Sequence, residues 1–135
     1  MLSNDIPGVG VDAVDIERFR VTLARTPTVR QRLFVDEELH GAAALADPTA
    51  SLAVRFAARE ATMKALGVGL GAFGFHDVWV RGGYGAVPSL AVTGRAAELA
   101  ADAGVSGWSL SLTHTDLVAI AFVVAAALIG FFLKE

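Results

Sequence analysis

Hydrophobic and small residues alternate near the start of the chain and then switch to a helical spacing. The alternation covers residues 7–14 ("PGVGVDAV") and predicts a first strand that ends near Asp12. Asp15 is expected to cap a helix with the sequence "IERFRVTLAR", because an aspartate there accepts hydrogen bonds from the first turn. The apolar residues that this helix places on one side are Ile16, Phe19 and Leu23.

The next part of the chain is predicted to be helical. A short helix is expected over residues 29–34, and Asp36 is expected to cap another with the sequence "EELHGAAAL". A long helix follows and carries the clearest boundary signals. Asp47 is its expected cap, Pro48 its first helical residue, and Gly67 the residue that ends it.

The second half of the chain consists mainly of predicted strands. The strands "FHDVWV" and "PSLAVT" flank the glycine-rich turn "GGYGA", and a helix is expected over residues 94–104. The segment "WSLSLTH" alternates strictly, and "LVAIAFVVA" is predicted to be a strand buried on both faces. The element order β-α-α-α-β-β-α-β-β predicts an α+β domain with a largely antiparallel sheet.

The composition fits one domain, residues 1–135, with a substantial core. Hydrophobic residues make up 54% of the chain and charged residues 19%, so a lone subunit exposes apolar surface and association is expected. The net charge of −3 argues against nucleic-acid binding. The absence of cysteine excludes disulfides and thiolate metal sites. The first residues lack the pattern of a secretory signal, which favours a cytoplasmic location.

An uncharged apolar run over residues 117–133 ("LVAIAFVVAAALIGFFL") permits two interpretations. Its length reaches the lower limit for a helix that crosses a membrane, so a tail-anchored membrane protein is one alternative. The favoured interpretation is a buried strand followed by a second apolar element. Membrane association is therefore not expected.

The long helix is apolar on two opposite sides. One side carries Leu52, Phe56, Met63 and Leu66, and the other carries Val54, Ala58, Ala61 and Ala65. Arg55 and Arg59 lie beside the larger apolar residues, whereas Glu60 and Lys64 lie one turn apart on a flank. The flanking pair is either a solvated salt bridge, worth a few tenths of a kcal/mol, or part of a ligand site. Glycines at 67, 69 and 71 and the scarcity of water-facing surface weaken the salt-bridge interpretation, and both interpretations stay open at this point.

Two further residues are candidates for the same chemistry. Asp12 has no structural task at the end of its strand, and an aspartate and a glutamate from different elements commonly hold Mg²⁺ together with substrate phosphates. Asp12 and Glu60 are therefore the candidate metal ligands. His114, in "SLTHT", shares a side of its strand with Trp108 and two leucines, so it is either a core histidine or, with Lys64, a phosphate contact.

Four segments together resemble the holo-[acyl-carrier-protein] synthases, which are short 4′-phosphopantetheinyl transferases. They are "GVGVDAVDIERF", "RFAAREATMKALG", "GAVPSLAVTG" and "SLTHTDLVAIAFVV", in the order and spacing of that family over roughly residues 8–125. The resemblance implies the 4′-phosphopantetheinyl transferase-like fold, with its long central helix packed on the sheet. It also implies Mg²⁺-dependent transfer of the 4′-phosphopantetheine arm of coenzyme A to a serine of apo acyl carrier protein, with release of adenosine 3′,5′-bisphosphate.

The family assigns roles to the matching positions. Its metal ligands fall on Asp12 and Glu60, its phosphate-contacting residues on Lys64 and His114, and a basic coenzyme A contact on Arg55. Glu60, directly or through a bound water, is the preferred acceptor of the serine proton. The family also implies a homotrimer with coenzyme A in clefts between subunits.

A basic segment is the candidate docking surface for the acidic carrier. Five arginines lie close together without an intervening acid: Arg18, Arg20, Arg25, Arg30 and Arg32. Such a run is either a docking patch or an ordinary solvated surface, and Arg18 matches a family docking position. Whether the carriers serve fatty-acid or polyketide synthesis stays open.

The chain departs from the family in three places. "AREAT" replaces the commoner "AKEA", "SLTHT" replaces "SLSHT", and the apolar tail over residues 126–135 extends past the usual end. The tail puts the carboxyl-terminal fold and the trimer surface in question. A catalytically inactive carrier-binding module of the same fold is the second alternative function.

Overall fold

The structure is a computed structural model that describes residues 6–127. Its strands are β1 (Gly8–Asp15), β2 (Val78–Arg81), β3 (Ser89–Val92), β4 (Gly107–His114) and β5 (Val118–Ala126). Its α-helices are α1 (Ile16–Arg25), α2 (Val29–Leu33), α3 (Asp36–Ala42), α4 (Thr49–Leu66) and α5 (Gly94–Asp102). A single 3₁₀ turn, η1 (Phe75–Asp77), precedes β2.

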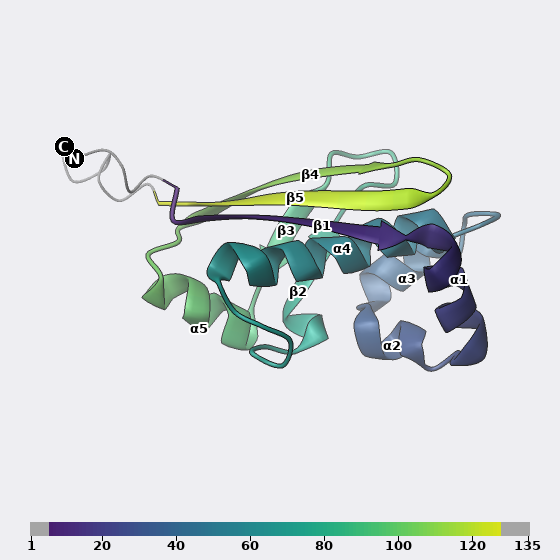
Figure 1. Ribbon diagram of the computed structural model, residues 1–135, viewed down its shortest axis with the longest axis horizontal. Coiled ribbons are helices and arrows are strands. Elements are labelled where there is room, and N and C mark those ends of the chain that lie inside the picture. The colour runs from purple at the N-terminus through teal and green to yellow at the C-terminus, as the bar shows by residue number, and fades with distance from the viewer. Residues whose placement is uncertain (1–5, 128–135) are drawn as a thin grey trace.

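The described strands form two antiparallel sheets (Figure 1). The larger sheet has the order β1-β5-β4, and β2 pairs only with β3 in a separate hairpin. The predicted α+β class with a largely antiparallel arrangement is confirmed. Four α-helices precede β2, because the short helix expected over residues 29–34, which the predicted order of elements left out, is the separate helix α2. The expected strand "FHDVWV" is shorter than predicted, because its first three residues form η1.

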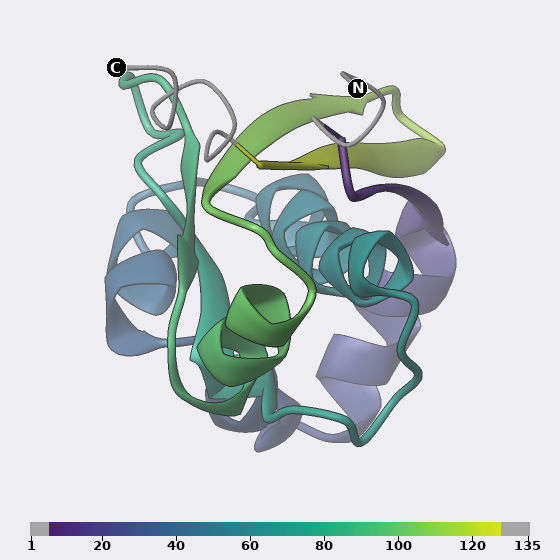
Figure 2. The same cartoon turned by 90° about the vertical axis from the view of Figure 1, so that its left-hand side faces the viewer.

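The long helix α4 packs directly under the larger sheet (Figure 2). Strand β1 comes unusually close to α4, since a Cβ atom on Gly8 or Gly10 would collide with the carbonyl oxygens of Ala65 and Ala61. The helix face below the sheet is built from alanines for the same reason, and Ala57, Ala58 and Ala61 are fully buried. Glycines on the strand and alanines on the helix therefore bring the first half of β1 against α4. The strand continues to Asp15, beyond the predicted end near Asp12.

The ends of α4 differ slightly from the prediction. Pro48 is the N-cap residue and the helix begins at Thr49, so Pro48 is not the first helical residue. Asp47 lies one position before the cap, and its Oδ1 accepts a hydrogen bond from the backbone N–H of Thr49 at 3.1 Å. The predicted end is confirmed, because Gly67 closes the helix with a left-handed φ of 69°.

The two predicted aspartate caps have different outcomes. Asp15 caps α1 as expected, since its Oδ1 accepts a hydrogen bond from the N–H of Arg18 at 2.8 Å. Asp36 is the first residue of α3 and not its cap. The cap residue is Val35, whose backbone N–H donates to Oε1 of Glu38 at 3.1 Å. Glu38 thus satisfies the N–H of the cap residue from inside the helix, and no side chain at the cap position accepts from the first turn.

Strand β5 is buried on one face only, which corrects the predicted burial on both faces. Ala119, Ala121, Val123 and Ala125 are fully buried against α4, whereas Phe122 on the opposite face is 42% exposed. The outer face carries exposed apolar side chains such as Phe122, and no helix within residues 6–127 lies against it (Figure 1). Within residues 6–127, no helix has both the length and the apolarity to cross a bilayer. The tail over residues 128–135 lies outside the described residues.

Candidate active site

The close approach of β1 to α4 brings three of the predicted site residues together. The carboxylate of Asp12 lies on the inner side of β1, and Oδ1 is 3.1 Å from the ammonium nitrogen of Lys64 on α4. The same ammonium group donates to the carbonyl oxygen of Val11 at 3.0 Å. Lys64 does not form the solvated salt bridge with Glu60 considered from the sequence, because it reaches across to Asp12 on β1 instead.

Glu60 lies half-buried on the same flank of α4. Burial raises the pKa of its carboxyl group, and the negative charge of Asp12 raises it further, while the positive charge of Lys64 acts in the opposite direction. Two carboxylates thus face one region with one ammonium group to balance them. A carboxylate pair with incomplete compensation is a suitable place for a cation.

A surface cavity of about 490 Å³ opens beside these carboxylates. Asp12 and Glu60 line one part of it, and Arg18 and Thr22 of α1 line another. Phe19 and Phe56 form an apolar wall, with their rings stacked at a centroid distance of 5.6 Å. The structure therefore places the predicted metal ligands and one predicted docking arginine around the same cavity.

The predicted docking arginines are not equivalent. Arg20 is tied down, because its guanidinium group pairs with Glu17 at 3.1 Å and with Asp47 at 2.8 Å. Hydrogen bonds from Thr49 and Arg20 hold the pKa of Asp47 at about 2. Arg18 and Arg25 are exposed. No acidic residue interrupts this segment in the sequence, but folding supplies two acids to Arg20 and leaves Arg18 as the residue beside the cavity.

Arg55 and His114 lie elsewhere, around a second cavity of about 390 Å³. This cavity is bounded by the first half of α4, the end of β4 and the connection between β2 and β3. His114 is exposed at the end of β4 with Nδ1 3.1 Å from the carbonyl oxygen of Thr115, so it is not a core histidine. Asp12 lies on β1 and His114 on β4, at opposite edges of the sheet. These two strands are about 10 Å apart, because β5 lies between them.

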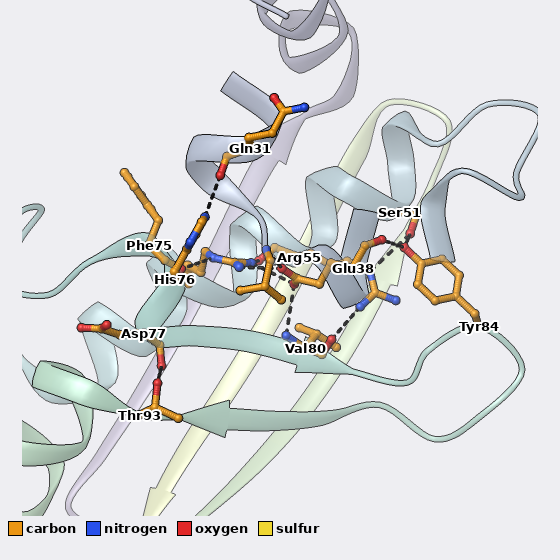
Figure 3. Close-up of polar contacts among 12 residues, drawn as sticks. Gln31, Glu38, Ser51, Arg55, Phe75, His76, Asp77, Val80, Tyr84 and Thr93 are labelled. Atoms are coloured by element: carbon orange, nitrogen blue, oxygen red, sulfur yellow. Dashed lines mark hydrogen bonds and ion pairs between the residues drawn. The ribbon is translucent and has the colours of Figure 1, made fainter. Parts of the chain in front are cut away.

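The guanidinium group of Arg55 is engaged inside the protein. It is only 2% exposed and donates to the carbonyl oxygens of Val80 at 2.9 Å and Gly82 at 2.8 Å. Its carbon lies 4.1 Å from the centre of the Tyr84 ring (Figure 3). Arg55 therefore borders the second cavity mainly as a residue that holds the β2–β3 connection against α4.

Sequence reasoning missed Glu38, which pairs with the second buried arginine of α4. Oε1 of Glu38 lies 2.6 Å from Nη2 of Arg59, and both side chains are 0% exposed. Glu38 also accepts from the backbone N–H of Val80, and Arg59 donates to the carbonyl oxygen of Phe75 at 2.8 Å (Figure 3). The signal available in the sequence was Arg59 itself, since a buried arginine needs an acid somewhere in the fold.

Comparison with known proteins identifies the family of this chain. Residues 8–123 match the family model described as the 4′-phosphopantetheinyl transferase superfamily. A protein of Frankia casuarinae named holo-[acyl-carrier-protein] synthase is 49% identical over 120 residues, which cover 89% of this chain and 97% of the relative. A protein of Streptomyces coelicolor with the same name is 45% identical over 121 residues, covering 89% and 97%.

Solved structures show the same fold. Holo-[acyl-carrier-protein] synthase from Neisseria meningitidis has a TM-score of 0.79 and 30% identity, covering 89% of this chain and 98% of that one. The Bacillus anthracis synthase, solved in complex with CoA (3′,5′-ADP), has a TM-score of 0.75 and 28% identity, covering 91% and 98%. The resemblance and the fold predicted from the sequence are thereby confirmed, and the chain belongs to the 4′-phosphopantetheinyl transferase superfamily.

Proposed function

We propose that this chain is a holo-[acyl-carrier-protein] synthase, which transfers the 4′-phosphopantetheine arm of coenzyme A to a serine of apo acyl carrier protein. The observation that carries the proposal is the cluster of Asp12, Glu60 and Lys64 beside a cavity that also exposes Arg18. The names of the relatives and the coenzyme A complex of the Bacillus anthracis protein support the same activity.

Mg²⁺ fits the residues beside the first cavity. Asp12 and Glu60 supply carboxylate oxygens, which are the ligands that Mg²⁺ prefers. No group of three or more metal-ligating side chains occurs among residues 6–127, so oxygens of the diphosphate and of water complete the ligand set we propose. When bound, Mg²⁺ neutralises the diphosphate and stabilises charge on the leaving group.

The reaction joins the serine oxygen of the carrier to the phosphorus that bears the pantetheine arm. The bond from that phosphorus to the bridging oxygen breaks, and adenosine 3′,5′-bisphosphate leaves with the electron pair. Glu60, directly or through a bound water, accepts the serine proton in our proposal, since its carboxylate lines the cavity beside Asp12. Lys64 places positive charge where negative charge develops on the phosphates, after it leaves Asp12.

The separation of the two cavities supports a site shared between subunits. Asp12, Glu60 and Arg18 border the first cavity, whereas Arg55 and His114 border the second at the other edge of the sheet. We propose that coenzyme A lies between the first cavity of one copy and the second cavity of a neighbouring copy. Each chain then supplies half of each site.

The outer face of the large sheet is the surface that we propose for this association. Val9 and Val11 are 54% and 51% exposed on this face, and Phe122 lies opposite Val11 in the sheet register. A second copy of the chain is the natural partner, because it brings an equally apolar face. We expect a homotrimer, and light scattering that gives a stable monomer with full transfer activity would contradict it.

A carrier-loading assay tests the activity itself. The purified chain is incubated with Mg²⁺, coenzyme A and several apo carriers, and the carrier mass is measured. A gain of one phosphopantetheine on the carrier is expected, and the range of carriers modified separates fatty-acid from polyketide partners. Carrier binding without any mass gain would show instead an inactive carrier-binding module.

A further inference from the structure

The connection between β2 and β3 forms one wall of the second cavity. Gly83, Ala86 and Pro88 of this segment line the cavity opposite the end of β4. Residues 82–88, here named the 82–88 loop, contain three glycines with positive φ angles between 70° and 87°. Glycines give a backbone little intrinsic stiffness, and the hairpin shares no backbone pairing with the larger sheet among the described strands. Side chains must therefore fix the position of this loop.

Tyr84 is the residue at the centre of the loop that reaches back to the helices. Its hydroxyl group donates to the carbonyl oxygen of Glu38 at 3.1 Å and accepts from Oγ of Ser51 at 3.0 Å. Arg55 lies over its ring at 4.1 Å, and Nε of Arg55 is 3.4 Å from Oγ of Ser51. Figure 3 shows these side chains converging between α3, α4 and the loop.

Gly41 provides the space that the Tyr84 ring occupies. A Cβ atom on Gly41 would overlap the Cε2 and Cδ2 atoms of the ring. Gly41 lies within helix α3, where glycine costs about 1 kcal/mol relative to alanine. The absence of a side chain at this position is thus explained by the ring packed against it. By contrast, Val87 of the same loop is 89% exposed, so its side chain is not packed against the helices.

We infer that Tyr84 is a positioning residue for the coenzyme A site. It anchors the 82–88 loop to α3 and α4, and Arg55 anchors the same loop through Gly82. The anchored loop sets the width of the second cavity, where the proposed function places part of coenzyme A. The inference rests on that proposed function, and it assigns to Tyr84 an effect on coenzyme A binding without contact with the reacting atoms.

The test compares coenzyme A binding among variants of the full chain. Tyr84→Ala removes the ring and both hydrogen bonds, so we expect the Kd for coenzyme A, measured calorimetrically with Mg²⁺, to rise about tenfold, equal to about 1.4 kcal/mol. Tyr84→Phe keeps the ring under Arg55 and is expected to raise Kd two- to threefold. The KM for coenzyme A rises in parallel, whereas kcat and the KM for the carrier stay within about twofold. Val87→Ala is the matched control and keeps the wild-type Kd.

A second pair of variants tests the packing of Gly41 against the ring. Gly41→Ala is expected to raise Kd in the wild-type chain by displacing Tyr84, and to have no effect on Kd in the Tyr84→Ala chain. Hydrogen exchange of the amides in the 82–88 loop is expected to accelerate in both single variants. If Tyr84→Ala fails to fold, Tyr84→Phe and Gly41→Ala decide the question, because both retain the ring.

The outcomes separate the inference from the proposed function. Folded Tyr84→Ala and Gly41→Ala variants that bind coenzyme A with the wild-type Kd would overturn the inference alone. A wild-type chain that binds no coenzyme A would overturn the proposed function, and the inference with it. A loss of kcat without a change in KM for coenzyme A would also overturn the inference, since it would assign Tyr84 to the chemical step.

Discussion

Nζ of Lys64 lies 3.1 Å from Oδ1 of Asp12, a residue 52 positions away. This salt bridge connects the long helix α4 to the first strand, β1. Lys64 is 55% exposed on its side chain, whereas Asp12 is only 16% exposed. The lysine side chain thus reaches β1 from the solvent side, while the Asp12 carboxylate is mostly buried. Without a cation, Lys64 supplies the positive charge that the Asp12–Glu60 pair requires.

Replacement of Lys64 by methionine is expected to strengthen binding of a divalent cation while weakening transfer. The variant removes the ammonium group that competes for Asp12, so the Kd for Mn²⁺ without coenzyme A should fall about fivefold, or about 1 kcal/mol. Transfer should fall at least about tenfold, because the phosphates lose a positive charge. Mn²⁺ titration followed by electron paramagnetic resonance measures the first effect. Lys64→Arg, which keeps the charge, is the control and should retain the wild-type Mn²⁺ affinity.

Local sequence patterns were sufficient to predict most elements of the fold. The alternation in residues 108–114 and the cap at Asp15 depend on neighbouring residues, and both are confirmed. The exposed outer face of β5 was not predictable in this way, because "LVAIAFVVA" is apolar at every position. An apolar side chain indicates that a residue prefers burial. Whether another layer covers that face of the sheet depends on the rest of the assembly.

In the candidate site, too, some features could be predicted from the sequence and others depended on distant contacts. Asp12, Glu60 and Lys64 were predicted together and lie together, because a family resemblance carries information about distant contacts. Glu38 was missed because its partner Arg59 is 21 residues away and no local pattern marks the pair. Arg20 was grouped with the docking arginines, yet folding places it beside Asp47, 27 residues away.

The stability of Glu60→Gln should depend on pH in a defined direction. The folded-state pKa of Glu60 is raised, so the folded chain holds this proton more tightly than the unfolded chain does. The contribution of Glu60 to wild-type stability is therefore lost as pH rises through the unfolded pKa of 4.5 toward the higher folded value, and the glutamine variant lacks this loss. Thermal unfolding in a chelating buffer should show the Tm of Glu60→Gln rising relative to the Tm of the wild type between pH 4 and pH 7. A constant difference across this range would contradict the prediction.

Carrier docking should depend more on Arg18 than on a comparable arginine elsewhere. Arg18→Glu should raise the KM for the carrier about tenfold, or about 1.4 kcal/mol, and should raise the Kd for coenzyme A by less, although Arg18 borders the first cavity. Arg95→Glu on α5 makes the same change in net charge away from the first cavity and should leave the carrier KM nearly unchanged. The effect of Arg18→Glu should shrink with added salt, because charge steering is screened over about 10 Å at 0.1 M. Equal KM values for the two variants at low salt would remove Arg18 from the docking surface.

The buried Glu38–Arg59 pair should show strong coupling in unfolding experiments. Arg59→Met leaves the fully buried Glu38 carboxylate without its cation and should cost about 3–5 kcal/mol. The Glu38→Leu/Arg59→Met variant should cost at least about 2 kcal/mol less than the sum of its single changes, because it leaves no unpaired charge. Urea unfolding of the three variants and the wild type measures the coupling. Additive losses would show that the two side chains stabilise the fold independently.

The final prediction concerns the two carboxylates at the junction of β1 and α4. If Asp12 and Glu60 serve one cation, Asp12→Asn and Glu60→Gln should each lower transfer at least about a hundredfold, or about 2.7 kcal/mol of barrier. The double variant should then be far less than additive, since the first change already removes the cation that both residues hold. Raising Mg²⁺ should recover part of the activity of each single variant but little of the double. If Glu60 acts only as a proton acceptor, Glu60→Gln should lose transfer and still bind Mn²⁺ with the wild-type affinity, while Asp12→Asn should not. If Glu60→Gln transferred the arm at nearly the wild-type rate, Glu60 would have no role in metal binding or in proton transfer.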